Sequence, residues 1–219
     1  ITRTGVKEPK FNTKPISSAL DMRPLPTHII ELAAWIEEYY LASTKAVWQT
    51  LLPAGIKRKR RIKTPAKGLI LPKQDQPLSD EQKSAYNRIT RSKAVRYLVQ
   101  GVTGSGKTRL YLELAADQIN SGKSVIVLVP EIALTPQLIA LFEASFPNII
   151  VPYHSGMSEA EKHLAWQKVL DSNNPLVVLG PRSGLFLPIN NLGLIVIDEC
   201  HESTYKQEQN PRYHAIPTA

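Results

Sequence analysis

A glycine-rich segment that ends in a lysine and a threonine carries the strongest chemical signal in the sequence. Residues 101–108 read Gly-Val-Thr-Gly-Ser-Gly-Lys-Thr and match the pattern G-x-x-x-x-G-K-[ST] in full. Glycines let backbone N–H groups approach phosphates, and a following helix turns its positive N-terminus toward them. We expect Lys107 to neutralise the β- and γ-phosphates of ATP and the Thr108 hydroxyl to hold Mg²⁺. The residues expected to contact the nucleotide here are Gly101, Thr103, Gly104, Ser105, Gly106, Lys107 and Thr108.

A pair of acidic residues follows the apolar run at residues 194–197. A buried parallel strand delivers the residues after it to the edge of the sheet where α/β proteins bind ligands. We therefore expect Asp198 to hold Mg²⁺ through water and Glu199 to act as the general base toward the attacking water. For Cys200, which lies between this pair and His201, we expect only a small packed side chain.

Two further loops follow apolar strands. Residues 128–137 read Leu-Val-Pro-Glu-Ile-Ala-Leu-Thr-Pro-Gln, and residues 180–186 read Gly-Pro-Arg-Ser-Gly-Leu-Phe. The second loop offers Arg182 and Ser183 for contacts with nucleic-acid phosphates. Each could also be an ordinary loop at the end of a strand, so neither decides the function by itself.

Short apolar strands alternate with helical patterns from residue 78 onward, which predicts a parallel sheet with helices on both faces. The fold class is α/β, with a P-loop domain of the RecA-like type. The predicted strands cover residues 94–100, 124–129, 149–151, 176–179 and 194–197, and the predicted helices cover residues 79–91, 107–120, 135–145 and 159–170.

The first third of the chain has a different texture. Helical spacing of apolar residues predicts helices over residues 27–41 and 44–52. Because Trp35, Tyr39 and Tyr40 lie on the first helical stripe, we expect core packing rather than base stacking for them. The predicted organisation is an N-terminal region at residues 1–56, a basic linker at residues 57–77, and an ATPase lobe at residues 78–219.

The charge of the chain is concentrated before the predicted lobe. Residues 1–77 hold 14 Lys and Arg against 6 Asp and Glu, so they carry the whole net charge of +8. Residues 57–67 contain seven basic residues and no acidic one. This pattern favours a polyanionic partner and makes Lys57 and Arg58 candidates for DNA phosphate contacts, although a solvated linker would look the same.

Several compartments and classes are disfavoured by composition. A single cysteine cannot build a disulfide framework or a four-ligand zinc site. No apolar run approaches the roughly 18 residues that cross a membrane, and no segment has the layout of a signal peptide. The expected location is the cytoplasm, without a membrane partner.

At this point the sequence resembles the PriA family of primosomal replication-restart helicases, in superfamily 2. The segments that carry the resemblance are residues 101–108, 129–137, 153–155, 182–188, 191–199 and 201–215. The last of these resembles an aromatic-rich loop that senses single-stranded DNA and couples it to ATP hydrolysis. Residues 32–41 and 51–58 resemble the end of a domain that recognises a 3′ strand end at a fork.

The resemblance implies roles for individual residues. Gln82 corresponds to a glutamine that reads adenine, and His201 corresponds to the residue that links nucleotide state to the DNA side. Tyr205, Lys206, Arg212 and Tyr213 correspond to the DNA-sensing loop, where stacking on tyrosine rings and neutralisation of phosphates would hold a single strand. The resemblance implies ATP-driven 3′→5′ movement on forks and single strands, with other primosome proteins and single-strand-binding proteins as partners.

Departures from the family pattern limit what this chain is expected to do. Cys200 stands where the family has a second glutamate, and too few residues separate Gly55 from Leu78 for the usual winged-helix domain. We interpret the chain as a truncated piece of a longer parent whose zinc ligands, second motor lobe and arginine finger lie elsewhere. The alternatives are a non-catalytic fragment that binds DNA and nucleotide, another superfamily 2 translocase, or a P-loop kinase.

Overall fold

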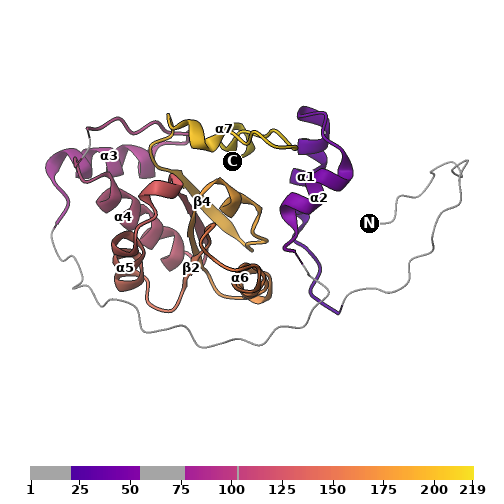
Figure 1. The fold of residues 1–219 in the computed structure, drawn as a ribbon. Helices are drawn as coiled ribbons and strands as arrows, with labels where there is room; N and C mark the ends of the chain where they lie inside the picture. Colours follow the sequence, from indigo (N-terminus) through magenta and orange to yellow (C-terminus); the bar gives the residue numbers. More distant parts are fainter. Residues whose placement is uncertain (1–20, 55–76, 103) are drawn as a thin grey trace, which may run out of the picture.

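A four-stranded parallel sheet forms the centre of the computed structural model, which describes residues 21–54, 77–102 and 104–219 (Figure 1). The strands lie in the order β2-β3-β1-β4. All three pairings are parallel. The predicted α/β class is therefore confirmed. The strands are β1 (Ser124–Leu128), β2 (Ile150–Pro152), β3 (Val177–Gly180) and β4 (Leu192–Ile197).

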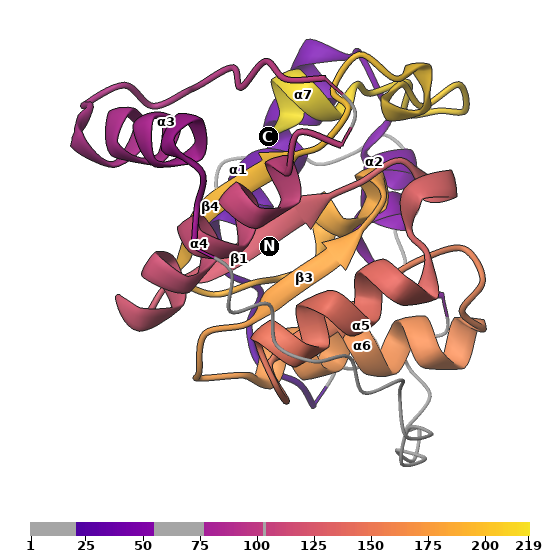
Figure 2. The ribbon, with the colours of Figure 1, turned by 90° about the vertical axis from the view of Figure 1, so that its left-hand side faces the viewer.

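Helices cover both faces of this sheet, because strand β1 is apolar on both of its sides. Val125 and Val127 pack against one helical layer, and Ile126 and Leu128 pack against the other. Figure 2 shows α5 and α6 running alongside the strands. The first layer holds α4 (Lys107–Asn120) and α5 (Pro136–Ser145), and the second holds α6 (Glu159–Asp171).

Helix starts follow the capping residues of the sequence. Ser79 caps α3 (Asp80–Arg91) in a capping box, in which its side chain accepts from the N–H of Gln82 and the Gln82 side chain accepts from the N–H of Ser79. Ser158 and Glu161 form the same arrangement at α6. Each cap satisfies N–H groups that a helix leaves unpaired in its first turn. The short elements are η1 (Glu131–Ala133), η2 (Arg182–Phe186), η3 (Ser203–Tyr205) and α7 (Ala215–Thr218).

The predicted strand at residues 94–100 is wrong. Residues 94–102 form neither a helix nor a strand, and Val95 and Leu98 are 94% and 82% exposed. A β-strand requires a ladder of hydrogen bonds to a neighbour, and this segment pairs with none of the four described strands. The phosphate-binding motif is therefore entered from an extended, exposed segment rather than from the sheet.

Two helices from the first third of the chain pack onto the lobe. These are α1 (Thr27–Tyr39) and α2 (Thr44–Leu51), and Figure 1 shows them together at one side of the sheet. The indole Nε1 of Trp166 in α6 donates a buried hydrogen bond of 3.1 Å to the carbonyl of Leu51. The helical pair and the sheet therefore share one apolar core.

The aromatic stripe of α1 is only partly internal. Trp35 and Tyr40 pack against the core as predicted, but Tyr39 is 60% exposed and the prediction is wrong for it. The Tyr39 ring stacks on the Trp35 ring within the helix, with 4.7 Å between the ring centres, rather than entering the core.

Candidate functional site

The glycine-rich loop wraps around the start of α4. Gly106 is the N-cap residue and adopts the left-handed conformation, with φ of 76°. The amide nitrogen of the Gln82 side chain donates to the carbonyls of Ser105 at 3.3 Å and Gly106 at 3.2 Å. Gln82 thus braces the loop from α3. Thr103, which the sequence places among the nucleotide contacts, lies outside the described residues.

The lysine of this loop faces the acidic residues after β4. The Nζ atom of Lys107 donates to the carbonyls of Gly101 at 2.9 Å and Val102 at 3.3 Å, and it lies 3.4 Å from Oε1 of Glu199. The Lys107 side chain is only 15% exposed. The two predicted motifs therefore meet in space, and an incoming phosphate would compete with Glu199 and the loop carbonyls for this ammonium group.

Two tyrosines hold Asp198 in place. The hydroxyl of Tyr111 donates to Oδ1 of Asp198 at 3.0 Å. The hydroxyl of Tyr205 lies 2.6 Å from the carbonyl of Asp198 and 3.1 Å from that of Leu128. Burial, followed by the charge of Asp198, raises the pKa of both hydroxyls above its usual range, so both stay protonated donors. Asp198 is thus fixed through its side chain and its backbone.

Tyr111 is a site residue that the sequence reasoning missed. It lies four residues after Lys107 in α4, and residues four apart share one face of a helix. This spacing predicts that Tyr111 and Lys107 point to the same side of α4, toward the acidic motif.

The remaining acidic-motif residues turn sharply out of β4. Glu199 has φ of 45°, a backbone conformation that residues other than glycine rarely adopt. Its Oε2 atom lies 3.7 Å from Nδ1 of His201, whose side chain is 74% exposed. Cys200 is partly buried. Glu199 therefore stands between Lys107 and His201 and can interact with either.

The residues present fit a magnesium ion of the nucleotide-bound kind. Mg²⁺ keeps several waters and takes one or two protein oxygens beside the phosphates. Asp198 supplies a carboxylate at the end of β4, and Thr108 supplies a hydroxyl in the first turn of α4. Among residues 21–54, 77–102 and 104–219, no group of three or more His, Cys, Asp or Glu side chains could hold a metal by itself.

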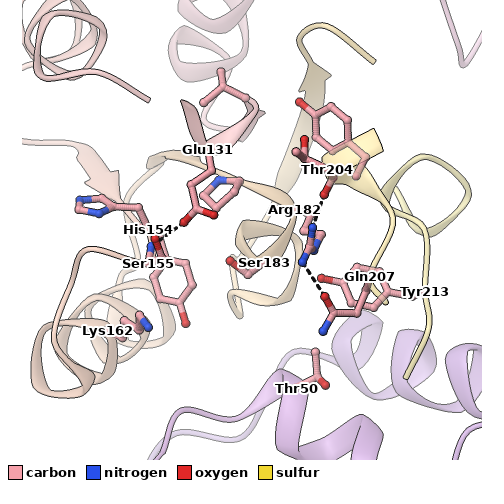
Figure 3. Close-up of a pocket in the computed structure, with 14 residues that line it drawn as sticks. Thr50, Glu131, His154, Ser155, Lys162, Arg182, Ser183, Thr204, Gln207 and Tyr213 are labelled. Atoms are coloured by element: carbon pink, nitrogen blue, oxygen red, sulfur yellow. Dashed lines mark hydrogen bonds between the residues drawn. The ribbon is translucent and has the colours of Figure 1, made fainter. Parts of the chain in front are cut away.

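A second concave site lies where β1, β2 and β3 end. It is a cavity of about 300 Å³, and α2 contributes Thr50 to its wall (Figure 3). Polar groups face it from several elements, including Glu131 after β1, His154 after β2, and Lys162 in α6. The backbone N–H of Ser155 donates to Glu131 at 3.3 Å, which joins two of the strand-end loops.

The two residues predicted for phosphate contacts, Arg182 and Ser183, both line this cavity. The guanidinium of Arg182 donates to the carbonyl of Thr204 and, at 2.6 Å, to the side chain of Gln207 (Figure 3). Arg182 therefore connects the loop after β3 to the loop after β4.

Base stacking by Tyr205 and Tyr213 is not available in this arrangement. The two residues are 1% and 2% exposed, and the Tyr213 ring packs edge-on against Phe186. Neither ring offers a face to a base, so the expectation is corrected: both tyrosines belong to the core. Lys206 is partly exposed and Arg212 is exposed, so they are the loop residues positioned for a polyanion. Lys57 and Arg58 lie outside the described residues.

The lobe that carries both sites matches a known family over most of its length. Residues 79–218 match the sequence profile described as DEAD/DEAH box helicase. The chain belongs to the DEAD/DEAH box helicase family. In this helicase family the sheet described above is a RecA-like lobe, and the predicted fold class is confirmed. Residues 1–53 match a second profile, described as a 3′DNA-binding domain of PriA.

Several individual proteins are similar to the chain, and they share one name, replication restart protein PriA. The replication restart protein PriA of Bacillus subtilis is 47% identical over 147 residues, which are 65% of this chain and 18% of that protein. The PriA protein of Rickettsia prowazekii is 37% identical over 222 residues, which are 99% of this chain and 33% of that protein. The predicted resemblance to PriA helicases is confirmed.

The similar region also covers 15% of the PriA protein of Synechocystis. The chain therefore spans one third or less of the length of these relatives. Within the described residues, no helix is long and apolar enough to cross a membrane.

Proposed function

We propose that this chain is the nucleotide-binding lobe of an ATP-dependent DNA helicase that moves 3′→5′ and acts in replication restart. The observation that carries the proposal is the meeting of Lys107 and Glu199, whose side-chain atoms lie 3.4 Å apart between the two ATPase motifs. A phosphate-binding lysine and a carboxylate that can orient the attacking water are two of the groups that P-loop enzymes use to hydrolyse a triphosphate. The PriA names of its relatives support replication restart as the process.

The chemistry assigns one step to each residue. Lys107 binds the β- and γ-phosphates and spreads their charge. Glu199 accepts a proton from water as the water oxygen bonds to the γ-phosphorus and the bond to the bridging oxygen breaks. Asp198 and Thr108 would hold Mg²⁺, which supplies charge neutralisation at the phosphates when it is bound. Gln82 lies on the Ser105–Gly106 side of the loop, where it can contact the nucleotide, and His201 is close enough to Glu199 to respond to the state of the site.

DNA is proposed to cross the ends of β1, β2 and β3. Cationic and polar groups line the cavity there, and backbone phosphates are the common target of such groups. The match of residues 1–53 to a 3′DNA-binding domain supports a DNA partner. The residues proposed to contact DNA are Arg182, Ser183, Lys206 and Arg212, with Lys57 and Arg58 in the basic run.

The chain by itself is proposed to bind nucleotide and DNA without unwinding. The support for this is that the chain spans a third or less of its relatives. We propose residues 1–56, 57–77 and 78–219 as the functional division, a cytoplasmic location, and primosome and single-strand-binding proteins as further partners.

Two titrations test the proposal on the 219-residue chain. A fluorescent ATP analogue with Mg²⁺ should bind, and Lys107→Ala should weaken that binding by more than tenfold. Labelled single-stranded DNA should bind with an affinity that falls steeply between 50 and 200 mM salt, as phosphate contacts require. Absence of both bindings would refute the function, and strand separation by the chain alone would refute the non-unwinding part.

The longer parent protein that we propose offers the decisive enzymatic test. Its ATP hydrolysis should be stimulated by single-stranded DNA and abolished by Lys107→Ala. A hydrolysis rate that ignored either DNA or this substitution would contradict the helicase assignment.

A further inference from the structure

The loop between η3 and α7 is hydrogen-bonded to Tyr40, a residue from the N-terminal helices. Tyr40 lies just after α1. Its hydroxyl accepts a hydrogen bond from the backbone N–H of His214 at 3.1 Å and donates one to the carbonyl of His214 at 3.5 Å. The two residues are 174 positions apart. One side-chain hydroxyl therefore engages both backbone polar groups of His214, in the way a neighbouring strand would.

His214 stands at the base of the loop that the DNA proposal uses. Lys206 and His214 form an antiparallel bridge, and the N–H of Gln207 donates to the carbonyl of Tyr213 at 2.8 Å. The ammonium group of Lys206 donates to the carbonyl of Arg212 at 2.7 Å. The two sides of the loop are thus joined, so that a hold on His214 is a hold on Lys206 and Arg212.

The ring of Tyr40 makes a second contact with the same loop. The Nζ atom of Lys206 lies 5.8 Å from the centre of this ring, within the range of a cation–π interaction. Trp35 and Tyr39 meet the Tyr40 ring edge-on, at 5.8 Å and 4.9 Å between centres. These neighbours restrict the rotamer of Tyr40, so its hydroxyl is already aimed at His214 before any ligand binds.

The other end of the loop reaches the ATP site. Tyr205 lies four residues after His201, the end of the acidic motif, and its hydroxyl donates to the carbonyl of Asp198 at 2.6 Å. The loop therefore has two fixed points. Tyr40 holds it to the helices of the 3′DNA-binding segment, and Tyr205 holds it to the backbone carbonyl of Asp198 in the acidic motif.

We propose that Tyr40 is a positioning residue, through which the N-terminal helices set the orientation of Lys206 and Arg212 for a single strand of DNA. The proposal rests on the proposed function, because it assumes that this loop contacts DNA. If Tyr40 were only a packing residue, its ring would stabilise the loop and removal of its hydroxyl would leave the loop unchanged. For a positioning residue, removal of the hydroxyl loosens the loop and weakens DNA binding.

Tyr40→Phe removes that hydroxyl and keeps the ring. Tyr39→Phe is the matched control, because it changes the adjacent residue in the same way and its hydroxyl makes no hydrogen bond to the described residues. Amide hydrogen exchange of the 219-residue chain, without DNA, should be roughly 3- to 10-fold faster at His214 and Lys206 in Tyr40→Phe. Unchanged exchange, or an equal change in Tyr39→Phe, would overturn the proposal.

Binding of a labelled single strand then tests the consequence for function. Tyr40→Phe should weaken this binding several-fold while the affinity of Tyr39→Phe stays at the wild-type value. Faster exchange at His214 with unaltered DNA affinity would show that the hydroxyl only stabilises the loop, and would overturn the positioning role. If the wild-type chain binds no single strand, the proposed DNA contact fails, and the hold of Tyr40 on the loop is judged by exchange alone.

Discussion

The hydroxyl of Tyr111 donates a hydrogen bond of 3.0 Å to the carboxylate of Asp198, and so joins the helix of the phosphate loop to the strand of the acidic motif. Through this bond the two halves of the nucleotide site have a defined separation before any nucleotide arrives. Preorganised groups lose less entropy on binding than groups that must be gathered.

Tyr111→Phe should weaken the site without dismantling the lobe. A hydrogen bond to a charged group contributes about 1.5–3 kcal/mol when it is buried, and Asp198 is only partly buried. We expect the free energy of unfolding in urea to fall by about 1 kcal/mol, and Mg²⁺-dependent nucleotide affinity to fall several-fold. Tyr97→Phe is the control, since its hydroxyl binds only an exposed carbonyl. Unchanged Mg²⁺ dependence in Tyr111→Phe would contradict the positioning of Asp198.

Glu199→Gln should separate binding from hydrolysis. Lys107 loses an anionic partner 3.4 Å away, so phosphates meet less competition for the ammonium group. Because this ion pair is partly exposed, we expect nucleotide affinity to rise only about 2- to 5-fold. In the longer protein, ATP hydrolysis should fall by about 10²-fold or more as the general base is lost. Glu202→Gln, a nearby change of the same charge, should alter neither, and weaker nucleotide binding in Glu199→Gln would count against the competition.

Gly106→Ala should cost more than the same change at another left-handed glycine. Gly106 and Gly122 have φ of 76° and 75°, which costs any L-residue about 1–2 kcal/mol. A Cβ atom on Gly106 would clash with Nε2 of Gln82, whereas one on Gly122 would meet nothing within 4 Å. Comparing the two variants by urea unfolding isolates the clash. Nucleotide affinity should fall in Gly106→Ala alone. Equal losses of unfolding free energy in the two variants would show that the Gln82 side chain moves away without cost.

The chain should lose stability at high pH through Tyr213. Burial raises the pKa of this hydroxyl to about 12, against a smaller opposing effect of Arg182. A raised pKa means that its stabilisation is complete below about pH 10 and is lost as pH rises toward 12. Between pH 9 and 11 the free energy of unfolding should fall about 1 kcal/mol less in Tyr213→Phe than in the wild type. Parallel pH profiles of the two proteins would refute this assignment.

Local signals predicted most of the fold because they act within a few residues. Ser79 with Gln82, and Ser158 with Glu161, are capping boxes that can be read as spaced pairs, and both form. The parallel strands follow from continuous apolar runs such as residues 124–128, which are buried on both sides. The strand expected at residues 94–100 failed because a ladder partner is a property of the whole fold and not of that segment.

The site residues could be predicted where glycines and charged side chains form a specific motif. Aromatic residues could not be assigned from the sequence, because a tyrosine can either stack on a base or pack in the core. Lys107 and Glu199 meet as the motifs imply. Tyr205 and Tyr213 look like stacking rings in the sequence. The structure instead brings the Tyr205 hydroxyl to the ends of β1 and β4, where it donates to the carbonyls of Leu128 and Asp198. No pattern in the sequence distinguishes a ring that faces solvent from one that bridges two strand ends.

Strand β4 lies at an edge of the sheet, which has a practical consequence for handling the protein. Within the described part of the chain it pairs only with β1, although its sequence, Leu-Gly-Leu-Ile-Val-Ile, is wholly apolar apart from glycine. Such an edge is a template for adding strands from other molecules. Concentrated samples of these 219 residues should self-associate by strand addition, and a lysine placed on the outward side of β4 should delay turbidity.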